Sequence, residues 1–112
     1  MKENEKDICL KIAQGVACSI EEEWSAALVV FDDLLEAGEF DCTYQQAGSL
    51  EIEKDFDVDY SIYLLFKKLR QVMHENKADA WNRARFKLYP TGQFCVDFEW
   101  DQGLADEVEA SS

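Results

Sequence analysis

The chain has 112 residues, which is long enough for one domain and too short for two of ordinary size. Its 11 basic and 24 acidic residues give a net charge of −13, which disfavours nucleic acid and anionic membranes as partners because Lys and Arg bind phosphate. A basic protein surface is a natural partner for such a chain, although acidic side chains also serve simply to keep small proteins soluble.

The sequence predicts a cytoplasmic protein. Residues 1–7 lack the basic-then-apolar pattern of a signal peptide, and no apolar run approaches the length of a membrane span. The four cysteines stand in apolar or alternating segments without a C-x-x-C pair, so we expect small buried thiols rather than disulfides. With only one histidine and no cysteines at ligand spacing, neither a metal site nor a cofactor is expected.

A helix and three strands are predicted in the first half of the chain. Apolar residues recur at spacings of three and four over residues 3–18, which predicts an amphipathic helix. Residues 24–31 are apolar on both faces, which predicts a central strand that is covered on both sides. Residues 39–46 alternate between apolar and polar, and residues 50–54 form a short third strand at an edge.

A second helix is predicted over residues 58–76. Asp57 or Asp59 can cap its start, because a carboxylate there accepts hydrogen bonds from the first backbone amides. Its apolar residues form one stripe, and basic residues such as Lys67 and Arg70 are expected to face water.

The segment 81–101 has the pattern of a β-hairpin. On each arm apolar residues alternate with charged ones, and a strand has a side-chain period of two. Pro90 and Gly92 supply the turn between the arms. The resulting register pairs Leu88 with Phe94, Phe86 with Val96, Arg85 with Asp97 and Arg83 with Glu99, so that the basic arm lies opposite the acidic arm.

The order of helix, three strands, helix and two strands predicts an α+β fold. In this fold both helices pack on one face of a mainly antiparallel sheet, within a single domain over residues 1–112. An acidic tail is predicted over about residues 103–112, and it is expected to be frayed from Asp106 onward.

No catalytic motif is present, so a protein without enzymatic activity is expected. His74 stands between Met73 and Glu75, but the sequence offers no motif that supplies it with a nucleophile or a paired acid, so it is interpreted as a surface residue near a helix end. Residues 55–59 have the aspartate spacing that begins a calcium-binding loop. The glycine and glutamate that this loop requires would fall at Tyr60 and Phe66, so the match fails.

Two groups of carboxylates on folded elements are the candidate partner-binding residues. If the three strands form a meander, the two groups converge on one negative surface, although each acid taken singly is more often a solvated surface residue. The groups lie around the first turn and before the second helix, and comprise Asp32, Asp33, Glu36, Glu39, Asp41, Glu51, Glu53, Asp55, Asp57 and Asp59.

The hairpin also resembles a known family. In the YezG-like immunity proteins a tryptophan precedes a strand, a glycine turn follows, and a strand of the form Gly-x-Phe-x-x-Asp-Phe-x-aromatic-Asp closes the sheet. The resemblance covers about residues 5–102 and includes Glu22-Glu23-Trp24 before an apolar strand. The positions of the closing strand are occupied here by Gly92, Phe94, Asp97, Phe98, Trp100 and Asp101.

The resemblance implies a cytoplasmic antidote that binds and neutralises a cognate toxin domain. Such toxins are commonly nucleases delivered between competing bacteria, as in contact-dependent growth inhibition. The expected mechanism is a 1:1 complex in which carboxylates pair with the Lys and Arg that a nuclease uses for phosphate, without direct binding of nucleic acid or membrane. Two alternatives stay open: an adaptor module that binds another basic protein, and a small hydrolase that uses carboxylates with an acquired metal.

Overall fold

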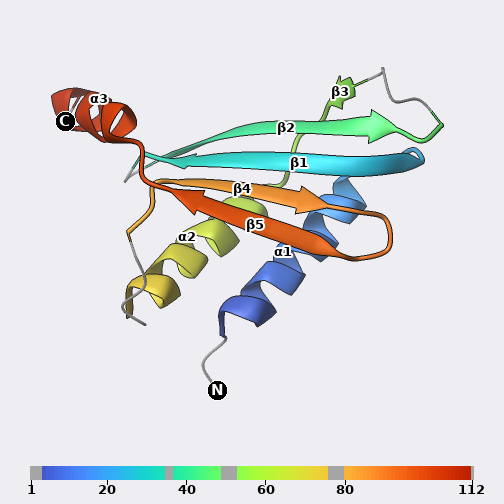
Figure 1. Cartoon of the computed structure of the whole chain (residues 1–112), viewed down its shortest axis with the longest axis horizontal. Helices are drawn as coiled ribbons and strands as arrows, with labels where there is room; N and C mark the ends of the chain where they lie inside the picture. The colour runs from blue at the N-terminus through green and yellow to red at the C-terminus, as the bar shows by residue number, and fades with distance from the viewer. Residues whose placement is uncertain (1–3, 35–36, 49–52, 76–79, 112) are drawn as a thin grey trace.

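The computed structural model describes residues 4–34, 37–48, 53–75 and 80–111. Five strands form one antiparallel sheet in the order β3-β2-β1-β4-β5, so the predicted α+β class is confirmed. Figure 1 shows α1 and α2 on the same side of the sheet and α3 beyond one end of the strands. The elements are α1 (Glu5–Ser19), β1 (Trp24–Asp33), β2 (Gly38–Gln46), β3 (Glu53–Asp55), α2 (Tyr60–Glu75), β4 (Arg83–Leu88), β5 (Phe94–Glu99) and α3 (Gln102–Ser111).

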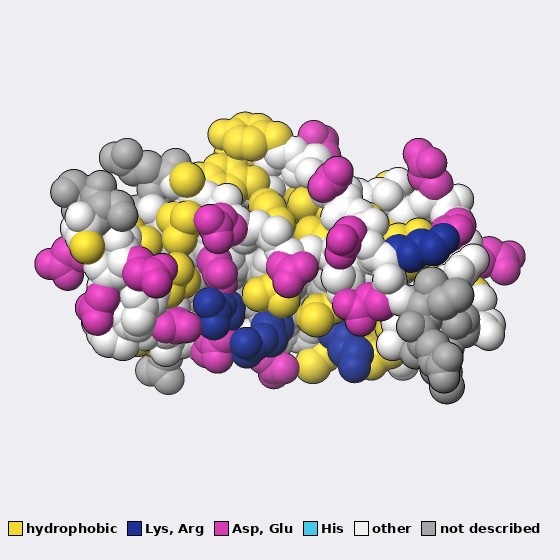
Figure 2. Space-filling view, turned by 90° about the horizontal axis from the view of Figure 1, so that it is seen from above, with side chains coloured by type: hydrophobic (Ala, Val, Ile, Leu, Met, Phe, Trp, Pro, Cys, Tyr) yellow, Lys and Arg dark blue, Asp and Glu magenta, His cyan; other side chains and the backbone are white. Residues whose placement is uncertain are grey.

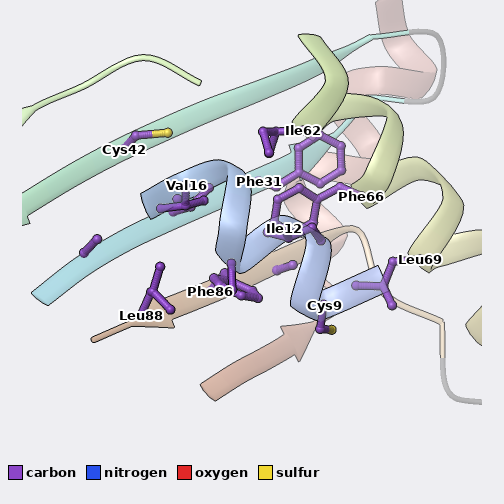
Figure 3. Packing of buried hydrophobic residues seen from close by; sticks show 14 of the residues in the cluster. Cys9, Ile12, Val16, Phe31, Cys42, Ile62, Phe66, Leu69, Phe86 and Leu88 are labelled. Carbon is purple, nitrogen blue, oxygen red and sulfur yellow. The ribbon is translucent and has the colours of Figure 1, made fainter. Parts of the chain in front are cut away.

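The core lies between the sheet and the two helices α1 and α2. The apolar stripe of α1 is fully buried at Ile12 and Val16, as its spacing of four predicts. Phe31 of β1 stacks on Phe66 of α2 with ring centroids 5.0 Å apart, and Figure 3 shows these two rings beside Ile12. Burial of these large side chains is the main source of stability for a sheet that is covered on one face.

The central strand differs from its prediction. β1 is indeed central, since it pairs with both β2 and β4. Helices cover only one of its faces, however, and on the other face Ala26 and Val30 are half-buried while Leu28 is 36% exposed. An antiparallel sheet can leave one face to water, and the apolar side chains on that face are therefore available for contacts.

The second helix begins and ends close to its predicted positions. Asp59 caps it, because its carboxylate accepts hydrogen bonds from the Tyr60 amide at 2.8 Å and from the Ser61 hydroxyl at 3.0 Å. Lys67 and Arg70 were expected to face water, which is wrong. Both side chains reach back to β1, where they contact a buried carboxylate.

The hairpin register is confirmed at every predicted pair, from Leu88 with Phe94 to Arg83 with Glu99. Gly92 has a φ of 91°, and its amide donates to the Tyr89 carbonyl at 2.9 Å. This left-handed conformation is the one that the sequence required of a glycine in the turn.

The C-terminal segment is a helix, so the prediction of a frayed tail is wrong. Asp101 caps α3, since its Oδ1 accepts a hydrogen bond from the Leu104 amide at 3.0 Å. The buried Asn82 holds the same aspartate at both backbone groups: its Nδ2 donates to the Asp101 carbonyl at 2.9 Å, and its Oδ1 accepts from the Asp101 amide at 2.8 Å. The helix is thereby attached to the end of the sheet.

The four cysteines are free thiols, of which only two are buried as expected. Burial raises the pKa of Cys9 to about 11 and that of Cys42 to about 12. Cys18 and Cys95 are exposed, because they lie on the outer sides of α1 and β5.

Candidate protein-binding surface

The face of the sheet opposite α1 and α2, here called the open face, carries side chains in stripes that follow the strands. Cross-strand register aligns these stripes, since Leu28 pairs with Thr43 on one side and with Lys87 on the other. The stripes are acidic on β2 and β3, apolar on β1, basic on β4 and again mainly acidic on β5. They comprise Glu39, Asp41, Glu53 and Asp55, then Ala26, Leu28 and Val30, then Arg83, Arg85 and Lys87, and finally Cys95, Asp97 and Glu99.

The charges on the β4 and β5 side compensate one another. The Arg83 Nε lies 2.6 Å from Asp32, and its Nη1 lies 3.2 Å from Glu99 and 3.0 Å from Asp101. The hydrogen bond to Asp32 is the main cause that raises the pKa of Arg83. Arg85 lies 2.9 Å from Glu99, so the basic stripe is largely occupied by the molecule's own acids.

The acids on the β2 and β3 side have no such compensation. Phe56 donates its amide to the Cys42 carbonyl at 3.1 Å, which brings Asp57 beside Asp41, and both charges add to the raised pKa of the buried Cys42 thiol. Within the described part of the chain, none of these acids forms an ion pair. The exposed, unpaired carboxylates that we call the acidic flank are Glu39, Asp41, Glu53, Asp55 and Asp57.

The nearest cation on β3 is directed away from the acidic flank. Lys54 alternates with Glu53 and Asp55 and therefore points to the other face, where its Nζ lies 2.8 Å from Glu22. The Tyr44 hydroxyl donates to the same carboxylate. The hydrogen bond from Lys54 is the largest cause that lowers the pKa of Glu22, and the hydrogen bond from Tyr44 is the second. The Glu22 carboxylate therefore keeps Lys54 directed away from the acidic flank.

Asp33 does not belong to the surface, although its sequence position suggested that it would. Strand alternation places Asp32 on the open face and Asp33 on the helix side, where its side chain is 0% exposed. Lys67 lies 2.8 Å from its Oδ1, and Arg70 donates to its Oδ2. The expectation that Asp33 contacts a partner is therefore corrected, because a buried, doubly paired carboxylate is a structural group.

The remaining predicted acids are divided between three situations. Asp32 lies on the open face but is engaged by Arg83. Asp59 is exposed and caps α2. Glu36 and Glu51 lie outside the described residues.

A shallow hollow lies between the acidic flank and the basic stripe. Its volume is about 460 Å³, and it is lined by apolar residues of β1 such as Ala26 and Leu28, by Glu53, and by Lys87 and Tyr89 at the start of the hairpin turn. The Lys87 Nζ lies 5.7 Å from the centre of the Tyr89 ring. Figure 2, seen from the side of β2 and β3, shows acidic side chains interspersed with hydrophobic surface and a short row of Lys and Arg. This surface therefore offers apolar contacts beside charged ones.

Histidine, cysteine and acidic side chains are the potential metal ligands among the described residues. Among them, no group of three or more His, Cys, Asp or Glu side chains is arranged to hold a metal ion. His74 is exposed in the last turn of α2, as its sequence position predicted. No helix in the described ranges is long and apolar enough to cross a membrane.

Sequence reasoning missed two exposed hydrophobic side chains in the first half of α2. Tyr60 is 67% exposed and Leu64, one turn later, is 51% exposed. Both residues lie outside the apolar stripe of α2, which contains Ile62 and Phe66. Apolar residues on the polar side of a helix are the signal that could have identified this patch.

Two comparisons with known proteins give concordant results. The chain matches the family model described as "Immunity protein YezG-like" over residues 6–112. It is also similar to a protein of Bacillus spizizenii described as "Immunity protein YezG". The two chains are 27% identical over 119 aligned residues, which cover 94% of this chain and 74% of the Bacillus protein.

Proposed function

Because the chain belongs to the YezG-like immunity protein family, we propose that it is a cytoplasmic, non-catalytic antidote that binds one cognate toxin domain and neutralises it. The expected setting is competition between bacteria, as in contact-dependent growth inhibition. The complex contains one copy of each protein, and neither nucleic acid nor membrane takes part in binding.

The observation that carries the proposal is the uncompensated acidic flank. A nuclease presents Lys and Arg to the phosphates of its substrate, so a surface of free carboxylates is complementary to it. On β4 and β5, by contrast, Arg83 and Arg85 already neutralise much of the acidic charge. We therefore infer that the toxin is basic, that it is a nuclease, and that it docks on the β2 and β3 side of the open face.

The proposed contact residues are a revised form of those selected from the sequence. The acidic flank supplies the central ones, with Asp32 and Asp59 at its margins, while Glu36 and Glu51 stay in the set on sequence grounds. Asp33 is withdrawn because of its burial. The apolar residues Leu28 and Val30 lie beside the flank and supply the hydrophobic contacts that affinity requires.

Co-purification with the toxin domain encoded beside this gene, together with a growth-rescue assay, tests the proposal. Wild-type protein is expected to form a stable complex with the toxin and to restore growth of cells that express it. If an active cognate toxin is neither bound nor neutralised, the immunity function is rejected and an adaptor role with another basic protein takes its place.

A charge-matched pair of variants tests the position of the interface. Asp41→Lys with Asp55→Lys is expected to slow association about tenfold or more, because it reverses the steering field of the acidic flank. Glu21→Lys with Glu107→Lys is the control, since both residues are exposed and the net charge changes equally. Equal association rates for the two variants would mean that net charge, and not the acidic flank, attracts the toxin.

A further inference from the structure

A stack of two tyrosines lies at the start of α2, which follows Asp57 of the acidic flank along the chain. The rings of Tyr60 and Tyr63 are nearly parallel, with centroids 5.3 Å apart and an interplanar angle of 24°. Together with Phe40 they line a hollow of about 360 Å³, which Ala37 and Gly38 of the β2 start complete. We call the three aromatic residues Phe40, Tyr60 and Tyr63 the aromatic platform.

The platform is held in place by the fold before any partner arrives. Tyr63 makes an edge-to-face contact with the buried Phe31, with ring centroids 6.1 Å apart. Gly38 permits this approach, because a Cβ at this position would lie 2.5 Å from the Phe31 ring and 3.0 Å from the Tyr63 ring. Tyr60 then stacks on an anchored ring while keeping 67% of its own surface exposed. A fixed, exposed aromatic ring binds with little loss of conformational entropy.

Two carboxylates precede the tyrosines of the platform along the chain. Asp57 lies in the segment before α2, and Asp59 directly precedes Tyr60 and caps the helix. In the ranges that the structure describes, no Lys or Arg forms an ion pair with either carboxylate. The aromatic faces carry negative quadrupole potential of their own, so the site favours a cation that also has an apolar or planar surface.

We propose that the aromatic platform binds an arginine side chain of the toxin, which stacks on Tyr60 beside the carboxylates of Asp57 and Asp59. This inference rests on the proposed immunity function and identifies its energetic centre. A guanidinium is planar, remains charged and is more weakly hydrated than an ammonium, so it can stack on an aromatic ring and bond a neighbouring carboxylate at once. The acidic flank attracts the toxin, and the platform retains it.

The first test compares substitutions at Tyr60 by measuring toxin affinity with the full-length protein. Tyr60→Leu removes the aromatic face and is expected to weaken binding about tenfold or more, whereas Tyr60→Phe keeps the face and is expected to stay within about threefold of wild type. Trp100→Leu is the control, because Trp100 is 47% exposed but follows β5 at the opposite edge of the sheet. Circular dichroism and thermal melting confirm that each variant is folded.

The second test identifies the partner group by double-mutant cycles. Each surface Arg and Lys of the toxin is replaced by Ala and measured against wild type and Tyr60→Leu. A single arginine is expected to show a non-additive effect with Tyr60→Leu and an additive one with Trp100→Leu.

Three results would overturn the inference. In the first, wild type binds and Tyr60→Leu binds equally well, which rejects the platform and leaves the immunity function standing. In the second, Tyr60→Phe loses as much affinity as Tyr60→Leu, which assigns the effect to the hydroxyl group. In the third, wild type itself fails to bind an active cognate toxin, which rejects the proposed function together with the platform.

Discussion

Asp32 and Asp33 show how one position along a strand decides what a carboxylate does. The two residues are chemically identical neighbours near the end of β1, yet one lies on the open face and the other lies beneath α2. Asp33 joins the sheet to the helix through Lys67 and Arg70, which fixes α2 and therefore the tyrosines at its start. A strand predicted to end at Phe31 gives no indication of this difference. Extending it by two residues would have placed Asp33 on the inner face.

Asp33→Asn is expected to destabilise the protein. The substitution removes the buried negative charge and one of the two oxygens that accept hydrogen bonds from Lys67 and Arg70. Since these two side chains keep 29% and 27% exposure, water replaces part of the lost interaction. We expect a loss of about 2 to 3 kcal/mol in the free energy of unfolding, measured by urea denaturation. Asp41→Asn, on the exposed acidic flank, is the control and should change stability by no more than about 0.5 kcal/mol. Equal stability of the two variants would contradict the structural role of Asp33.

At the scale of elements, the parts predicted well are those whose signals are local. The β4–β5 register follows from the alternation on both arms and from the turn glycine, all within about twenty residues of sequence. α3 was missed because its many acids and Gly103 indicate a solvated tail. Its start depends on Asp101, which the side chain of Asn82 holds from the adjoining end of β4. A cap that depends on a side-chain contact outside its own segment gives little signal in a single sequence.

The same reasoning applies to the candidate surface. The sequence predicted an acidic surface near the first turn and before α2, and the pairing of β2 with β3 brings Asp55 beside Thr43 on it. The aromatic platform depends on α2 crossing the start of β2, which is a tertiary contact. Tyr60 could have been identified as a candidate binding residue because it lies outside the apolar stripe of α2. Phe40 could not, because nothing in the sequence indicates that it lies beside Tyr60 and Tyr63.

Gly92→Val is expected to lower stability by about 1 kcal/mol or more. A Cβ at this position would meet nothing within 4 Å, so the cost arises only from the left-handed φ of 91°. Gly92→Asn should cost less, since asparagine tolerates this conformation. Thermal unfolding of both variants measures the difference. If valine and asparagine destabilise equally, the strain is not conformational and the turn differs from the one described.

At the scale of the whole molecule, salt is expected to act in opposite directions on the free protein and on its complex. The net charge of −13 makes the folded chain repel itself, so added NaCl should raise the melting temperature of the free protein. The same salt should slow association with the toxin about tenfold or more, because it screens the acidic flank. Melting curves and stopped-flow association, recorded over one series of salt concentrations, test both effects. A complex that forms at the same rate throughout would show that electrostatic steering is absent.

The position of β1 in the sheet has a consequence for how the chain folds. β1 pairs with β2, which follows it directly in the chain, and also with β4. The β1–β4 pairing joins residues 27–32 to residues 83–88. Closing so long a loop is entropically costly, so the β1–β4 ladder is expected to form late and to limit the folding rate. During synthesis on the ribosome, one edge of β1 therefore stays unpaired until the β4–β5 hairpin emerges. A chain cut short before residue 83 would keep that apolar edge exposed and would be prone to aggregate.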